Sequence, residues 1–159
     1  MPTKLRFGLL LAAVLLFCGS NSVNRPLTAN DILNLVNQDR IAQGLSELTL
    51  NPTLNLAAMA KAEDMLNRDY FSHDGPDGKE PWYWFKALGY NYSYAGENLA
   101  EGYTDPIDLE HSWMTSPSHR ANILSPFYSE VGLAVVNEND RNIIVQFFGS
   151  KENKVTLRQ

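Results

Sequence analysis

The chain is poor in cysteine, in histidine and in basic residues, and these shortages exclude several classes of protein. It contains one cysteine, Cys18, so no disulfide can form within the chain and the hydrophobic core must hold the fold together. Its 13 lysines and arginines are outnumbered by 18 aspartates and glutamates, which gives a formal net charge of -5. This charge repels a phosphate backbone, so we expect no nucleic-acid partner. The longest apolar run, residues 7–17, is too short for a permanent membrane span.

The first 22 residues have the pattern of a secretory signal peptide. Two basic residues precede the apolar run, and residues 18–22, which are small or polar, follow it. Cleavage after Ser20 or Ser22 would deliver the mature protein to the outside, as a secreted, extracellular or periplasmic protein without a thiol. A lipoprotein anchored through Cys18 is the minority alternative, because Phe17 is too large for the position before a lipidated cysteine.

The rest of the chain is long enough for one domain, over residues 31–150, preceded by a linker (23–30) and followed by a tail (151–159). Apolar periodicity predicts a first helix capped by Thr28 or Asn30 and ending near Gly44, and further helices at 53–69, 81–89 and 106–116. The second helix has Leu56 on its apolar stripe and Lys61 outward. Residues 90–95 are expected to form a loop, and 130–136 and 143–148 a hairpin. This order of elements indicates the α+β class.

Three segments carry residue types suited to a functional site. Residues 70–78 place His73 between the end of a helix and a Pro-Asp-Gly turn, and residues 96–100, Gly-Glu-Asn-Leu-Ala, contain Glu97. In the third segment, residues 113–124, we expect His119 on a rigid turn, because the residue before Pro117 avoids the helical conformation. Each signal alone is weak. A lone histidine more often makes a structural hydrogen bond, and a lone Gly-Glu-Asn is more often an exposed turn.

In this order, the three segments resemble the signatures of the CAP superfamily (the SCP or cysteine-rich secretory, antigen 5 and pathogenesis-related 1 proteins) in its short bacterial form. The Gly-x-Ala and Val-Gln-x-Phe-Gly patterns of the two strands agree, so the resemblance covers residues 31–150. It implies a three-layer α-β-α sandwich with a small, mainly antiparallel sheet. It also implies a site of two histidines and two acids, which His73, His119 and Glu97 match, whereas Ser116 occupies the position of the second acid.

The resemblance implies a metal site that is reduced in this chain. Two neutral imidazoles and a carboxylate suit Zn²⁺ with an open coordination position, but structural zinc sites use four ligands. We therefore expect weak Zn²⁺ binding by His73 and His119, with Glu97 as a third ligand or as the partner of a histidine. His111 is expected to face solvent or to pack, and the aspartates of residues 74–77 are expected to form a turn rather than a calcium loop.

Two functions from different classes remain open. The first is a secreted, non-catalytic and monomeric domain that binds a divalent metal weakly and a small apolar or cell-wall-derived ligand, in a cleft bordered by Trp82, Trp84 and Ser116. The second is a secreted metal-dependent hydrolase, acting on peptides or cell wall, in which Glu97 is the one matched carboxylate left to serve as base. A purely structural interaction module is a third interpretation. The aromatics of residues 81–85 form either buried core or a partly exposed rim of the cleft.

Overall fold

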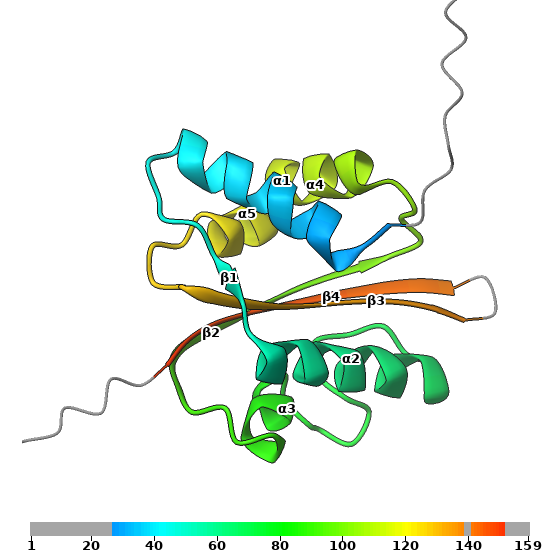
Figure 1. Ribbon diagram of the computed structural model, residues 1–159. Coiled ribbons are helices and arrows are strands. Elements are labelled where there is room, and N and C mark those ends of the chain that lie inside the picture. Colours follow the sequence, from blue (N-terminus) through cyan, green and yellow to red (C-terminus); the bar gives the residue numbers. More distant parts are fainter. Residues whose placement is uncertain (1–26, 139–140, 152–159) are drawn as a thin grey trace, which may run out of the picture.

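The structure is a computed structural model that describes residues 27–138 and 141–151. It has three layers (Figure 1). Helices α1 (Ala29–Ala42), α4 (Pro106–Thr115) and α5 (Pro117–Ile123) cover one face of a central sheet, and α2 (Pro52–Asn67) and α3 (Trp82–Ala87) cover the other. The α+β class and the α-β-α sandwich are thus confirmed. The expected signal peptide at 1–22, the first half of the linker and nearly all of the tail lie outside the described residues.

The sheet has four strands in the order β1-β3-β4-β2. They are β1 (Thr49–Leu50), β2 (Tyr92–Glu101), β3 (Glu130–Glu138) and β4 (Arg141–Lys151). The short β1 pairs with β3 in parallel, and the other two pairs are antiparallel, as expected for a mainly antiparallel sheet. Strand β2 is an edge strand, so one side of its backbone has no neighbouring strand.

Side-chain caps explain where the three longer helices begin. Thr28, one of the two expected caps, accepts a hydrogen bond from the Asp31 amide at the start of α1. Asn51 and Asp105 each accept hydrogen bonds from two amides in the first turns of α2 and α4. Both of these helices begin with proline, whose missing amide hydrogen would have no partner there in any case.

Side chains of the sheet alternate between two cores. On the side of α1, α4 and α5 the core includes Leu48, Val131, Leu133, Ile144 and Phe148, together with Ile32, Val36, Leu109, Trp113 and Ile123 from the helices. On the other side it includes Leu99, Ala134, Ile143, Val145 and Phe147, together with Leu54, Ala57, Ala58, Met65 and Phe85. The helix α2 lies so close to β3 that a Cβ on Gly132 would meet the Leu54 backbone at 2.2 Å. None of the helices formed by residues 27–138 and 141–151 has both the length and the apolar character that a membrane span needs.

Three sequence-based expectations are wrong. Most of residues 90–95, expected as a loop, belong to the ten-residue β2, because the alternating tyrosines suit a strand and the segment pairs with β4. Lys61 is fully buried and Leu56 is 61% exposed, so the buried face of α2 is rotated from the one expected. Finally, Pro117 begins a new helix rather than a turn, because proline suits the first helical position, and His119 lies inside that helix.

Candidate functional site

The candidate site is built around the free edge of β2, where side chains take the place of a neighbouring strand. Three donors from residues 113–128 bond to outward carbonyl oxygens of β2: Trp113 Nε1 to Leu99 (3.3 Å), Asn122 Nδ2 to Glu97 (3.0 Å) and Tyr128 Oη to Ala95 (3.0 Å). Unpaired carbonyls on an edge strand cost free energy when they are buried and invite pairing with other chains when they are exposed. These hydrogen bonds therefore give the three carbonyl oxygens of β2 a partner. They also join residues 113–128 to the segment that contains Glu97.

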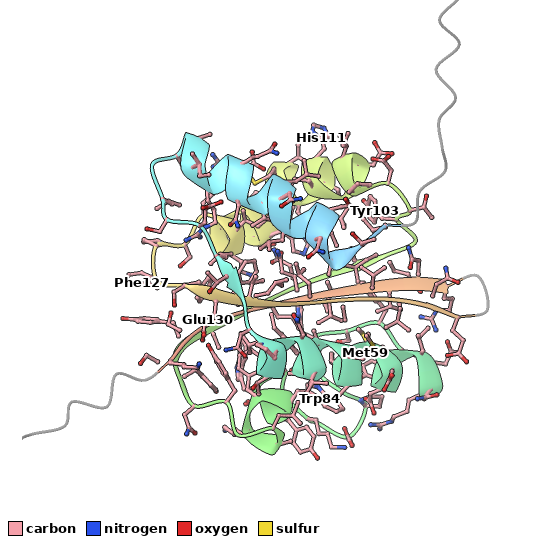
Figure 2. The ribbon with its side chains drawn as sticks, in the orientation of Figure 1. Met59, Trp84, Tyr103, His111, Phe127 and Glu130 are labelled. Atoms are coloured by element: carbon pink, nitrogen blue, oxygen red, sulfur yellow. The ribbon has the colours of Figure 1, made fainter. Side chains whose placement is uncertain are left out.

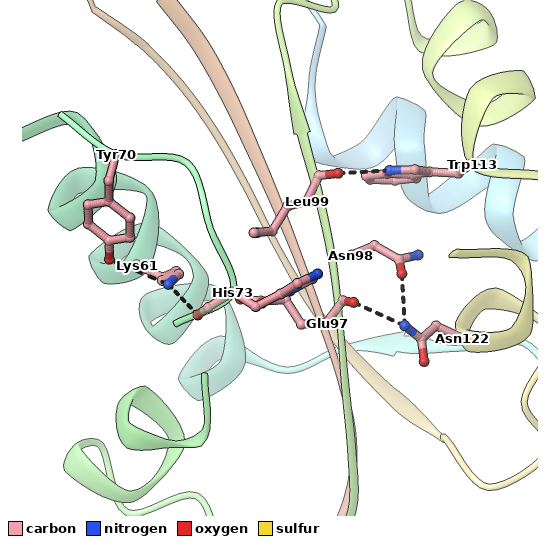
Figure 3. Close-up of polar contacts among 8 residues, drawn as sticks. All are labelled: Lys61, Tyr70, His73, Glu97, Asn98, Leu99, Trp113 and Asn122. Carbon is pink, nitrogen blue, oxygen red and sulfur yellow. Dashed lines mark hydrogen bonds and ion pairs between the residues drawn. The ribbon is translucent and has the colours of Figure 1, made fainter. Parts of the chain in front are cut away.

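Gly96 and Asn98, the residues on either side of Glu97, hold this part of β2 in place. A Cβ on Gly96 would lie 2.5 Å from Tyr128 Oη, so only glycine permits the tyrosine to reach the strand. Asn98 is fully buried, and its amide nitrogen donates to the His119 carbonyl (3.2 Å) and to Gln146 Oε1 (3.0 Å). Its side-chain oxygen accepts from Asn122 (2.9 Å; Figure 3). The segment Gly-Glu-Asn is thus a piece of strand in which the neighbours of Glu97, Gly96 and Asn98, are both fixed by contacts with the rest of the fold.

The side chain of Glu97 points to the opposite face, toward α2, and meets His73. The distance between Glu97 Oε1 and His73 Nδ1 is 2.5 Å, although the two residues lie 24 positions apart. The carboxylate side chain is only 2% exposed, whereas the imidazole is 60% exposed. Glu97 therefore holds one ring nitrogen of His73, and the other, Nε2, is left for solvent, a metal or a ligand.

A buried lysine fixes the loop that carries His73. Lys61 Nζ donates to the His73 carbonyl oxygen (2.7 Å) and lies 5.1 Å from the centre of the Tyr70 ring (Figure 3). Tyr70 in turn donates to Asp64 on α2 (2.5 Å). Since the lysine comes from α2 and Glu97 from β2, the histidine is attached to two elements of the fold.

The charges of these groups shift one another's pKa values. The hydrogen bond to Glu97 raises the pKa of His73 above its usual value. Burial raises the pKa of Glu97, although the contact with His73 and the charge of Lys61 oppose this shift. Burial, and then the charge of His73, lower the pKa of His119. The pKa values of the two histidines are therefore shifted in opposite directions, and His73 is the more basic of the two.

His119 lies on the other side of the β2 edge, in the short helix α5. Its carbonyl accepts the hydrogen bond from Asn98, and its half-buried ring is tilted at 47° to the Trp113 ring, with 6.5 Å between ring centres. His73 contacts Glu97 and the His119 carbonyl contacts Asn98, so the two histidines are held by adjacent residues of β2. The structure thus joins His73 directly to Glu97, whereas His119 is joined to the same strand through its carbonyl and Asn98.

A cavity of about 310 Å³ opens beside His73 and Glu97, and His119 is not among its lining residues. It is lined by His73, Pro81, Trp82, Ala95, Gly96, Glu97 and Asn122. Of the three residues expected to border a ligand cleft, Trp82 is among the lining residues, whereas Trp84 and Ser116 are not. Trp84 is half-buried on α3, and Ser116 ends α4, with its hydroxyl 3.4 Å from that of Ser118.

The other acidic and histidine candidates lie outside this group. Asp77 forms ion pairs with Arg68 (3.1 Å) and Lys79 (2.9 Å), and the contact with Lys79 contributes most to lowering its pKa to about 2. A carboxylate that is already paired with two cations favours the turn interpretation over a calcium loop. His111 is exposed on α4 and lines a different cavity.

The donor set fits a metal ion only in part. Within residues 27–138 and 141–151, no three histidine, cysteine, aspartate or glutamate side chains are grouped so that they could hold one ion. His73 Nε2 and the ring of His119 are the donors left, because Glu97 Oε1 is engaged by His73 Nδ1 and Glu97 Oε2 is buried. A carboxylate that holds the far nitrogen of a metal-binding histidine is common in metal sites. A metal ion at His73 Nε2 would therefore have the Glu97 carboxylate behind it, on the far nitrogen of the ring.

Comparison with known proteins agrees with this geometry. Residues 33–148 match the family model described as CAP, the Cysteine-rich secretory protein family. The chain belongs to this family. The matched residues include His73, Glu97 and His119, and also the three donors that close the β2 edge.

Among curated proteins, the chain is 38% identical over 105 residues to YkwD of Bacillus subtilis, described as uncharacterized, and this match covers 66% of the chain and 41% of YkwD. Among solved structures, an extracellular protein containing a SCP domain from Bacillus anthracis is similar at 26% identity and a TM-score of 0.67, over 80% of this chain and 45% of that one. An outer surface protein of Borrelia burgdorferi shares the fold, with 20% identity and a TM-score of 0.72 over 80% and 98% of the two chains. The chain thus spans about two fifths of the curated relative's length.

Several residues of the site were missed from the sequence. Asn98 and Asn122 lie within the motif segments 96–100 and 113–124, but their roles do not follow from the sequence, and Lys61 was expected on the exposed face of α2. One signal was available: each is a polar residue next to apolar or small neighbours, and a buried polar group must have a specific partner.

Proposed function

We propose that this protein is a secreted, non-catalytic CAP domain that binds a small apolar or cell-wall-derived ligand in the cavity beside His73, Glu97 and His119. The observation that carries the proposal is the cavity itself. Its walls combine an aromatic and a proline surface, from Trp82 and Pro81, with a few polar groups, which is the usual composition of a small-molecule site. Glu97 Oε2 is buried and has no hydrogen-bond partner in the part of the chain that the structure describes, so a ligand that brings a donor would satisfy it.

A binding role is favoured over catalysis because one oxygen of the Glu97 carboxylate holds His73 and the other is buried away from solvent. Metal-assisted hydrolysis needs a base that is free to take a proton from water. Glu97 is nearly enclosed and holds His73, and the position where the family has its second acid is Ser116, whose hydroxyl is a poor base. The domain would then retain recognition without turnover.

We further propose that the site binds Zn²⁺ weakly, in the micromolar range or worse. His73 Nε2 and His119 would be the ligands, and Glu97 would orient the His73 ring. A bound ion would add positive charge at the mouth of the cavity. Only a neutral imidazole can bind zinc, and the pKa of His73 is raised, so binding should weaken as the pH falls through that raised value rather than through the ordinary value of about 6.5.

Titration calorimetry tests the metal proposal. Zinc is titrated into the purified protein and into the variants His73→Ala and His119→Ala, with His111→Ala as a matched control, because this third histidine lies outside the site. Each site variant should lose most of the heat, and the control should keep it. Nanomolar affinity would mean that further ligands exist, and heat unaffected by either site variant would place the metal elsewhere.

One observation favours the metal-dependent hydrolase as a second candidate. The short His73–Glu97 contact gives an imidazole that is held at one nitrogen and exposed at the other, which is also the arrangement of a general base. A screen against peptide and cell-wall substrates, with and without chelator, separates the two functions. Turnover that chelation abolishes, and that His73→Ala also abolishes, would replace the binding proposal.

Secretion is supported by the pattern of residues 1–22 and by the extracellular and outer surface relatives. We expect export to remove residues up to Ser20 or Ser22. The mass of the exported protein measures this directly, because cleavage there removes Cys18. A protein that keeps Cys18 with the added mass of a diacylglycerol would be a lipoprotein instead.

A further inference from the structure

A second cavity lies in the opposite helical layer, between α1 and α4. Its volume is about 250 Å³, and it is lined by Leu35, Gln38, Asp39, Ile107, Glu110, His111 and Met114. We name it the α1–α4 groove. Figure 2 shows His111 on the outer side of this layer, whereas Trp84 lies on the other side of the sheet. No residue of the groove lines the cavity beside His73.

The unusual group in the groove is the carboxyl of Glu110. The residue is only 7% exposed, and neither of its carboxylate oxygens has a hydrogen-bond donor among the described residues. A buried carboxylate without a donor or a cation is costly. Burial raises the pKa of Glu110 to about 8, and the neighbouring Asp39 adds to the shift, first because the protonated Glu110 carboxyl can share its hydrogen with Asp39 and then through charge repulsion. Among the described residues, no lysine or arginine lines the groove beside this pair of acids.

The lining and the volume of the groove indicate which kind of positively charged group would fit beside Glu110. A metal ion is a poor fit, since in the described part of the chain no three acidic, histidine or cysteine side chains gather around one point. Leu35, Ile107 and Met114 provide apolar walls suited to an alkyl stem. The volume is below the usual range for small-molecule sites, of about 300–1,000 Å³, and suits one long side chain.

We propose that the α1–α4 groove binds a single arginine side chain of a partner polypeptide. The planar guanidinium can donate to two acids at once, to Glu110 and to Asp39, and its stem would lie against the apolar walls. Ile107, which is 66% exposed at the groove, would give the partner's backbone an apolar contact. Binding transfers no group. It requires Glu110 to be ionised, so a proton leaves to solvent where that acid was neutral.

The test uses N-acetyl-arginine amide as the probe and the methyl NMR signals of Leu35 and Met114 as the readout. N-acetyl-citrulline amide, which has the same shape without the charge, should bind at least tenfold more weakly. Glu110→Gln should weaken arginine binding at least tenfold. Two controls should keep it within twofold: Glu63→Gln, which changes an exposed acid on α2, and His73→Ala, which separates this groove from the proposed metal and ligand site.

The proposal fails if citrulline binds as well as arginine, or if Glu110→Gln binds arginine unchanged. A small free diamine such as putrescine that binds as tightly as the blocked arginine would also overturn the assignment to a polypeptide side chain. If Glu110→Gln does not fold, Asp39→Asn carries the same expectation, a loss of at least tenfold, and unchanged binding in that variant overturns the proposal equally.

Discussion

At the scale of single residues, Glu97 joins the two halves of the site through different atoms. Its carboxylate faces α2 and holds His73, whereas its carbonyl oxygen points out of the edge of the sheet and accepts from Asn122 on α5. Because successive strand residues point to opposite faces, the next residue, Asn98, reaches the His119 carbonyl. Two adjacent residues of one strand therefore position both histidines.

The first prediction concerns the protonation of the two histidines in metal-free protein. The contact with Glu97 raises the pKa of His73, so this ring should keep its proton above the ordinary pH of about 6.5. Burial lowers the pKa of His119, which should lose its proton below that pH. Titration followed by NMR of the imidazole nitrogens measures both values.

Glu97→Gln is the control for this titration, and it should lower the pKa of His73, because a neutral amide no longer favours the imidazolium. The raised pKa also makes stability depend on pH. The stabilisation from this contact is fully present at a pH below the pKa that His73 has in the unfolded chain. It is lost as the pH rises through the higher pKa that His73 has in the folded protein. A titration in which His119 is the more basic ring would show that the contact is absent in solution.

At the scale of elements, the edge of β2 depends on side-chain donors. We predict that Asn122→Ala lowers the free energy of unfolding by about 1–3 kcal/mol, because it removes the donor to both the Glu97 carbonyl and Asn98 Oδ1. Chemical denaturation measures the loss. The exposed Asn91→Ala is the matched control and should change the stability by less than about 0.5 kcal/mol. Equal effects of the two changes would mean that water satisfies the edge as well as Asn122 does.

The loop at residues 70–78 gives a second prediction at this scale. Lys61→Met keeps the buried stem but removes the donor to the His73 carbonyl, so we expect faster amide hydrogen exchange in this loop and a loss of about 1–2 kcal/mol in stability. The exposed Lys86→Met on α3 serves as control and should leave the exchange of the loop unchanged. Replacing a buried charge by an apolar side chain can be neutral for stability. Loop exchange is therefore the decisive readout, and protection equal to that of the parent protein would refute a positioning role for Lys61.

At the scale of the whole molecule, the sequence predicts local elements well and the site only through the ordered motifs. The helices at α1, α2 and α4 follow from caps, prolines and apolar spacing, and the final hairpin follows from alternation. Strand β2 was missed because its pairing with β4, more than 40 residues away, gives no local signal. The burial of Lys61 was missed for the same reason, since its partner is a carbonyl of the following loop. A cleft bordered by Trp82 was expected, but its other walls could not be predicted, because they depend on how α3, α5 and β2 meet.

The claim that His73 and His119 share one metal-binding site at the edge of β2 is tested most directly by diffraction at the zinc absorption edge. Crystals of the protein would be grown with saturating zinc, at a pH above the raised pKa of His73. We predict one anomalous peak about 2.0–2.1 Å from both His73 Nε2 and a ring nitrogen of His119, with Glu97 still bonded to His73 Nδ1. A peak at any other place in the molecule, or no peak between the two histidines, would contradict the claim.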